Sequence, residues 1–145
     1  MSKLILLACL ASALYMTGLI WFVQVVHYPL FDRVGLDGFR TYHAAHSRLT
    51  SYVVLLPMVI ELGTSFLLVA DRPEGSPTWL AWLGLALAVA TWGVTFFLSV
   101  PAHGRLAGGF DPEAYHSLVS TNILRALAWT GHSAVVLAMT ARAIR

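Results

Sequence analysis

The chain has 145 residues, of which 58% are hydrophobic and only 11% are charged. Soluble domains carry roughly a quarter charged residues, so this composition excludes a water-soluble protein and predicts one embedded in a lipid bilayer. The formal net charge is +2 and no run of basic residues occurs, which argues against a nucleic-acid partner.

Four apolar runs follow one another along the chain, at residues 4–26, 49–70, 78–102 and 117–141. A helix needs about 20 such residues to cross a hydrocarbon core of about 30 Å. The first run begins like a signal peptide, but it continues unbroken to Val23, so we expect a membrane helix there. The predicted fold is all-α, a four-transmembrane-helix bundle in a single integral membrane domain of residues 1–145.

A polar turn divides the chain into two helical hairpins, 1–70 and 77–145. The turn, ADRPEGSPT at 70–78, contains two prolines that cannot continue a helix. Basic residues near the helix ends are balanced: Lys3, Arg72, Arg142 and Arg145 on one side, and Arg33, Arg40, Arg48 and Arg105 on the other. The positive-inside rule therefore gives no strong orientation. The short N-terminus and the Arg-bearing tail favour a multi-pass protein of a bacterial inner membrane with both termini in the cytoplasm.

The two hairpins share a sequence plan, in which a proline and a histidine lie near the end of the first helix and an aspartate then precedes a Tyr-His pair. The corresponding residues are Pro29, His27, Asp37 and Tyr42-His43 in one hairpin, and Pro101, His103, Asp111 and Tyr115-His116 in the other. Aspartate is a favoured N-cap, which would place each Tyr-His pair in the second turn of a helix. The pattern predicts a tandem repeat with a pseudo-twofold axis along the membrane normal. Chance similarity between two helix starts is the alternative.

Histidines are expected to gather at one membrane face, because the first and third helices end where the second and fourth begin. The set is His27, His43, His46, His103 and His116, whereas His132 lies deep in the fourth run. Neutral imidazole suits copper, iron and zinc, and residues three apart share a helix face. We predict that the set binds a transition metal, with Tyr42 and Tyr115 orienting the rings. Haem b and hydrogen bonding to lipid headgroups are the alternatives; five imidazoles exceed the two axial positions of a haem.

Polar residues run inward from this face on three helices. Glu61 lies eighteen residues after His43, or five turns, and so on the same helix face. The fourth run carries Asn122, Arg125 and His132 at helical spacing, and the first carries Gln24. Ionisable groups at membrane depth usually face the bundle interior or a cavity.

Two interpretations of this stripe remain open. In one, Glu61 and Arg125 form a structural ion pair without chemistry. Alternatively, Glu61, Arg125 and His132 form the catalytic part of a pocket, in which Gln24 and Asn122 help to bind a cofactor and Glu61 or His132 relays protons.

The fourth helix contains TNILRALAWT, a T-N-x-x-R-x-x-x-W-T pattern formed by Thr121, Asn122, Arg125, Trp129 and Thr130, and residues 21–31 read WFVQVVHYPLF. Together they resemble a group of small, uncharacterised four-helix bacterial membrane proteins, which implies the architecture and no particular activity. The W…P-L-F phrase is also similar to membrane-bound haem-dependent protoporphyrinogen oxidases, although the mid-helix histidine of that family is missing. Size and helix count are similar to anthrone-oxygenase-like membrane proteins.

The sequence thus predicts a membrane-embedded, histidine-ligated metalloprotein with redox or oxygen chemistry on a small hydrophobic substrate from the bilayer, as in a metal-dependent membrane oxidoreductase. The alternatives are a non-catalytic subunit or scaffold of a larger membrane complex, a haem b protein, and a metal or proton carrier that uses Glu61, Arg125 and His132. A homo-oligomer is compatible with a bundle this small, although no GxxxG pattern within the four apolar runs marks a dimer face.

Overall fold

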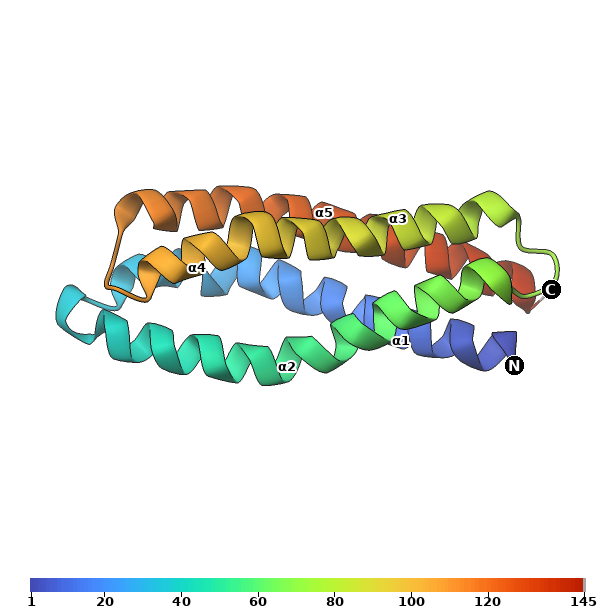
Figure 1. The fold of residues 1–145 in the computed structure, drawn as a ribbon, viewed down its shortest axis with the longest axis horizontal. Helices are drawn as coiled ribbons and strands as arrows, with labels where there is room; N and C mark the ends of the chain where they lie inside the picture. Colours follow the sequence, from blue (N-terminus) through green and yellow to red (C-terminus); the bar gives the residue numbers. More distant parts are fainter. Residues whose placement is uncertain (145) are drawn as a thin grey trace.

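The structure is a computed structural model that describes residues 1–144, and over this range it contains helices and no strand (Figure 1). The elements are α1 (Ser2–Phe22), the π-helical turn η1 (Val23–His27), the 3-10 helix η2 (Pro29–Arg33), α2 (Leu36–Ala70), α3 (Thr78–Val94), the π-helical turn η3 (Thr95–Ser99), α4 (Val100–Leu106) and α5 (Pro112–Ala143). They form four continuous helical spans that are long and apolar enough to cross a membrane. The predicted four-helix bundle is confirmed.

Each long helix has two neighbours in the bundle. α1 packs against α2 and α5, and α3 packs against α5 and α2, so α2 and α5 face each other across the diagonal. Both termini lie at the end that holds the 71–77 turn (Figure 1). The opposite end holds the η2–α2 and α4–α5 connections, and we call it the histidine end.

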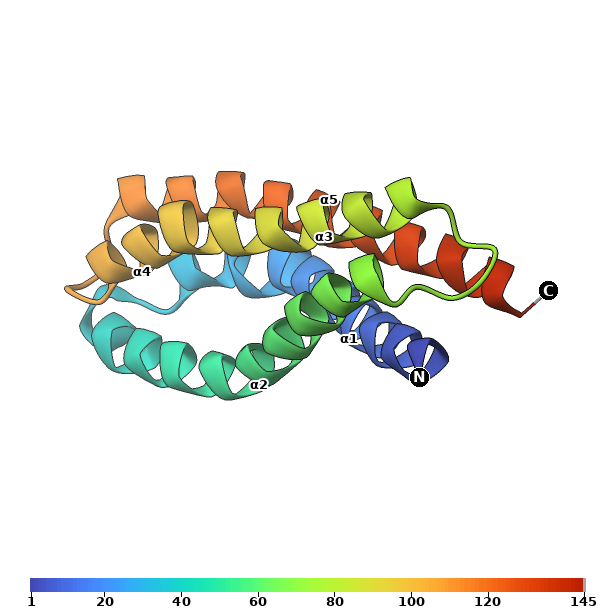
Figure 2. The same ribbon diagram turned by 45° about the vertical axis from the view of Figure 1, so that its right-hand side comes forward.

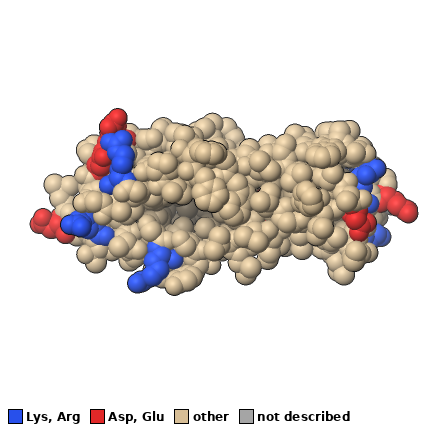
Figure 3. Space-filling view, viewed as in Figure 1, with Lys and Arg blue, Asp and Glu red and all other residues tan. Residues whose placement is uncertain are grey.

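An apolar belt surrounds the middle of the bundle. Figure 3 shows charged side chains gathered at the two ends and an uncharged surface between them. Large hydrophobic side chains are exposed on this surface, among them Phe97 and Phe66 at 80% and 67%. Because α2 has 35 residues, it is about 50 Å long and exceeds a hydrocarbon core of about 30 Å. The chain is an integral membrane protein whose helix ends project from the lipid.

The two predicted aspartate caps have different outcomes. Asp111 caps α5, because its carboxylate accepts from the amides of Glu113 and Ala114 at 3.0 and 3.1 Å, and Pro112 takes the first helical position. Asp37 was expected to cap α2, and that prediction is wrong. Gly35, at φ +82°, is the N-cap, so α2 begins at Leu36 and Asp37 lies inside the first turn. A left-handed glycine permits this earlier start.

A widened turn occurs at a corresponding place in both hairpins. η1 and η3 each end two residues before a proline, Pro29 and Pro101 respectively. A proline ring clashes with the carbonyl four residues earlier in a regular helix, and here those carbonyls belong to Val25 and Phe97, inside the π-helical turns. π-bulges relieve such clashes and are frequent at functional sites. The shared device supports the tandem repeat that the sequence predicts.

Acid should weaken the start of α5. The amide of Ala114, followed by the Arg105 guanidinium, lowers the pKa of Asp111. A carboxylate with a lowered pKa stabilises the fold above its ordinary pKa, and that contribution disappears as the pH falls through the lowered value. In detergent, the thermal unfolding midpoint of Asp111→Ala should lie below that of the wild type at about pH 7 and converge with it as the pH falls through the lowered pKa of Asp111. An equal deficit at all pH values would contradict this, and Asp71→Asn at the opposite end is the control.

Candidate functional site

Four of the five predicted histidines form one cluster at the histidine end. His27 closes η1, His43 and His46 lie on α2, and His103 lies on α4. Nε2 of His27 is 2.7 Å from Nδ1 of His46, and Nε2 of His43 is 3.0 Å from Nδ1 of His103. The two pairs are adjacent, since the rings of His46 and His103 stack with centroids 5.5 Å apart.

Aromatic rings close the cluster on the loop side, and hydroxyl groups orient two of its members. Phe31 is fully buried, with its ring edge-on to His46 at 5.0 Å between centroids, and Phe39 stacks on His43 at 5.7 Å. The Tyr28 hydroxyl lies 3.0 Å from Nε2 of His103, and the Thr50 hydroxyl lies 3.2 Å from Nδ1 of His46. His43 and His46 are buried, and His27 and His103 are half-buried.

His116 does not join the cluster. In α5 the inward positions near the start are Ala114, Tyr115 and Leu118, and His116 is exposed. In α2 the corresponding histidine, His43, is the inward residue. Successive helical residues differ by about 100° in direction, so a shift of one residue exchanges which member of a Tyr-His pair faces the core.

The tyrosines predicted to orient the rings lie elsewhere. The Tyr115 hydroxyl donates to the carbonyl of Pro29 at 3.4 Å, and the half-buried Tyr42 ring packs edge-on against Phe31 at 5.7 Å between centroids. Tyr28 fills the predicted role instead. The sequence signal that could have found it is its position between His27 and Pro29.

The nitrogen separations within each pair suit ligands of one ion. A tetrahedral ion with Zn–N distances of about 2.0–2.1 Å holds its ligand nitrogens about 3.3 Å apart. The paired nitrogens lie slightly closer than this, at 2.7 and 3.0 Å. Over residues 1–144, no three His, Cys, Asp or Glu side chains already converge as a metal shell. The imidazoles are hydrogen-bonded in pairs, so an ion would have to replace these hydrogen bonds.

A cavity lies beneath the cluster and opens on both sides of α2. One part, of about 210 Å³, is lined by α1 and α2 residues that include Ile20, His46 and Val54. The other part, of about 240 Å³, reaches between α2 and the η3–α4 segment, where it meets Ser99 and His103. Both parts share Tyr28, His46, Thr50, Val54 and Arg125. The hollow on the face of Figure 3 lies between α2 and the α3–α4 segment, where the second part opens.

The curvature of α2 accounts for this space. α2 is bowed away from the other helices on its histidine half (Figures 1 and 2), and it contains Pro57. A proline inside a helix removes one backbone hydrogen bond and kinks the axis. The bow separates α2 from α3 and α4 at the level of the apolar belt, so the cavity faces lipid.

Arg125 lies beside the cavity within a network of neutral side chains. Its Nη1 donates to Oδ1 of Asn122 at 3.2 Å and to the Ser99 hydroxyl at 3.5 Å, and its guanidinium stacks over the Trp129 ring at 5.2 Å. Asn122 in turn donates to Oε1 of Gln24 at 2.9 Å. The predicted residues Gln24 and Asn122 thus support Arg125.

Glu61 does not pair with Arg125, contrary to the ion-pair interpretation. Oε2 of Glu61 accepts from Nε1 of Trp129 at 2.7 Å, and Oε1 lies 2.9 Å from Nδ1 of His132. The angle of that second contact departs from hydrogen-bond geometry. Across the bundle, Nε2 of His132 lies 3.4 Å from the Ser65 hydroxyl and 3.7 Å from the Cys9 thiol.

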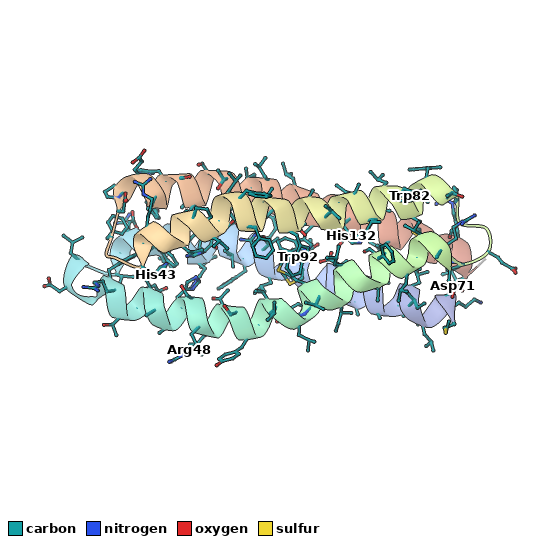
Figure 4. All side chains as sticks on the ribbon, viewed as in Figure 1. His43, Arg48, Asp71, Trp82, Trp92 and His132 are labelled. Carbon is teal, nitrogen blue, oxygen red and sulfur yellow. The ribbon has the colours of Figure 1, made fainter. Side chains whose placement is uncertain are left out.

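The Glu61–His132 group is therefore separate from the histidine cluster. Figure 4 shows His43 at the histidine end and His132 well along the bundle from it. Glu61, His132 and Cys9 are almost completely buried, and the void beside the last two is only about 10 Å³. The contacts of Cys9 and Ser65 had no sequence signal, because each looks like a small packing residue on its own helix.

No protein-family model matches the chain, and comparisons with curated proteins and with solved structures give no match either.

Proposed function

We propose that the chain is a membrane-embedded metalloprotein that binds one transition-metal ion at His27, His43, His46 and His103 and performs redox or oxygen chemistry on a hydrophobic substrate. The observation that carries the proposal is the meeting of four imidazoles from three helical segments within 2.7–3.0 Å in two adjacent pairs. Imidazole nitrogens are ligands that copper, iron and zinc accept.

The surroundings of the cluster support a reactive centre. A purely structural metal site would be closed, whereas this one adjoins a cavity that faces lipid and reaches His46 and His103. Four imidazoles fill a tetrahedral shell, so an open position for chemistry requires an ion that accepts more than four ligands, as iron and tetragonal copper do. A substrate entering between α2 and its neighbours could therefore approach the cluster without passing through water.

The residues of the chain have distinct roles in this proposal. Tyr28 orients His103 through its hydroxyl, which meets Nε2 while Nδ1 faces His43, as outer hydrogen bonds commonly do for ligating histidines. Thr50 meets the same nitrogen of His46 that faces His27, so this hydroxyl would give up its contact when an ion binds there. Phe31 and Phe39 exclude water from the loop side. A bound copper or iron ion would supply the one-electron and oxygen chemistry.

Metal content tests the proposal directly. Protein purified in detergent and loaded with Cu²⁺, Fe²⁺ or Zn²⁺ should retain about one equivalent after gel filtration, and His46→Ala should lose it, because that side chain belongs to the cluster core. His116→Ala is the matched control, since that histidine is exposed outside the cluster. Retention of metal by His46→Ala, or no retention by the wild type, would overturn the proposal. A Soret band in the absorption spectrum of the purified protein would show that the protein binds haem b in place of a metal ion.

A further inference from the structure

We propose that Arg125 binds the carboxylate of a long-chain amphipathic acid that enters the cavity from the bilayer. The inference names the substrate class of the proposed function and rests on that function only in this respect, because the binding site itself can be tested in metal-free protein.

The first step is the lack of a counter-charge at Arg125. Over residues 1–144 no carboxylate lies within 4 Å of its guanidinium, since the ion-pair contacts involve only Arg33, Arg105 and His132. An arginine side chain stays protonated in proteins. A charge at membrane depth is costly unless it is paired, and Ser99 and Asn122 supply only neutral oxygens.

The second step is the orientation of the side chain. Arg125 is only 7% exposed, and its Nε is buried with no hydrogen-bond partner within the described part of the chain. The same side chain lines both parts of the cavity. Asn122, held by Gln24, and Ser99 engage Nη1, so a carboxylate in the cavity would approach the Nη2–Nε side of the guanidinium and would have to uncover the buried Nε.

The third step is the chemistry of the ligand. A planar guanidinium suits carboxylate and phosphate oxygens. Arg125 lies thirteen residues into α5 from Pro112, which is about 20 Å along the helix. A bilayer phospholipid keeps its phosphate at the interface, whereas a single carboxylate on one chain is small enough to be drawn to this depth.

The fourth step is the space and its surroundings. A part of about 210 Å³ corresponds to about seven water volumes of about 30 Å³ each, enough for a carboxylate and the first few carbons. The rim residues Phe22, Leu49 and Val53 are exposed to lipid, so the rest of the chain can lie in the bilayer. The carboxylate end is then the part of the ligand beside His27 and His46.

Binding of oleate to metal-free protein in neutral detergent micelles tests the inference. Titration followed by tryptophan fluorescence or calorimetry should show saturable binding of about one oleate, and methyl oleate should bind at least about tenfold more weakly because an ester carries no charge. Arg125→Gln should reduce oleate affinity at least about tenfold, with Arg125→Lys in between because lysine keeps the charge and loses the planar fork. Arg48→Gln, an exposed arginine of α2, should leave the affinity unchanged.

Two outcomes would overturn the inference, and a third would separate it from the proposed function. Equal binding of oleate and its methyl ester by the wild type would show that the carboxylate is not recognised, and this comparison needs no variant to fold. Tighter binding of dodecyl phosphate than of oleate would assign the site to a phosphate ligand instead. Oleate binding by a protein that takes up no metal would leave the ligand site intact and remove the proposed function.

Discussion

Replacement of Glu61 by leucine should lower the free energy of unfolding by about 3–5 kcal/mol, the usual cost of breaking a buried charged pair by removing one partner. Oε2 of Glu61 accepts from Nε1 of Trp129 at 2.7 Å, and Oε1 lies 2.9 Å from Nδ1 of His132 without hydrogen-bond geometry. Leucine accepts from neither, and the side chain it replaces is only 1% exposed. Loss of helicity during titration with SDS in mixed micelles measures the effect. Glu74→Gln is the control, because Glu74 is exposed in the turn after α2.

Glutamine at position 61 separates a structural role from a carrier role. Glu61→Gln keeps a carbonyl oxygen for Trp129, so it should cost about 1–2 kcal/mol, in line with one weakened hydrogen bond. If Glu61 relays protons, the same variant should abolish proton uptake by liposomes while the protein remains folded. Because the Glu61–His132 group is closed to the cavity, we expect proton flux through wild-type liposomes no greater than through empty ones. A wild-type flux abolished by Glu61→Gln would establish the carrier alternative.

The architecture and most of the histidine cluster could be predicted because they depend on coarse properties of the chain. Helix length and apolarity fix the number of spans, and antiparallel threading then brings the ends of α1 and α4 to the start of α2. Each of His27, His43 and His103 lies within a turn or two of such an end. No knowledge of helix rotation is needed to place them at the same face.

The failures at the site depend on helix rotation and on the level at which helices meet, both of which the sequence fixes poorly. His116 and Tyr115 differ by one residue, or about 100° around the helix, and the structure turns the tyrosine inward. Glu61 of α2 meets α5 at Trp129 and His132, about one and two turns beyond Arg125. Which residues meet at the centre therefore depends on side-chain reach, and His132 and Trp129 take the contact with Glu61.

The binding of one ion by both histidine pairs should make the four imidazoles energetically interdependent. The alternative is one ion in each pair, His27 with His46 and His43 with His103. The rings of the two pairs approach within 5.5 Å. Two divalent ions at about 5 Å repel by on the order of 10 kcal/mol even at an effective dielectric constant of about 20. Among residues 1–144, the hydrogen bonds and ring contacts of the four histidines are with histidine, tyrosine, threonine and phenylalanine side chains. No carboxylate in these contacts could bridge two ions and offset their repulsion.

Alanine variants distinguish the two arrangements. With one shared ion, His27→Ala and His43→Ala should each weaken metal binding by at least about tenfold to hundredfold, as even the loss of an outer hydrogen bond to a ligand does. The double variant should then fall short of the sum of the single effects, because the ion has already been lost. Competition against a chromophoric chelator gives the affinities, and elemental analysis gives the stoichiometry. The contrary result is two ions in the wild type, one of which His27→Ala retains at full affinity. Each pair would then bind its own ion independently, and the cavity would adjoin a centre with two metals.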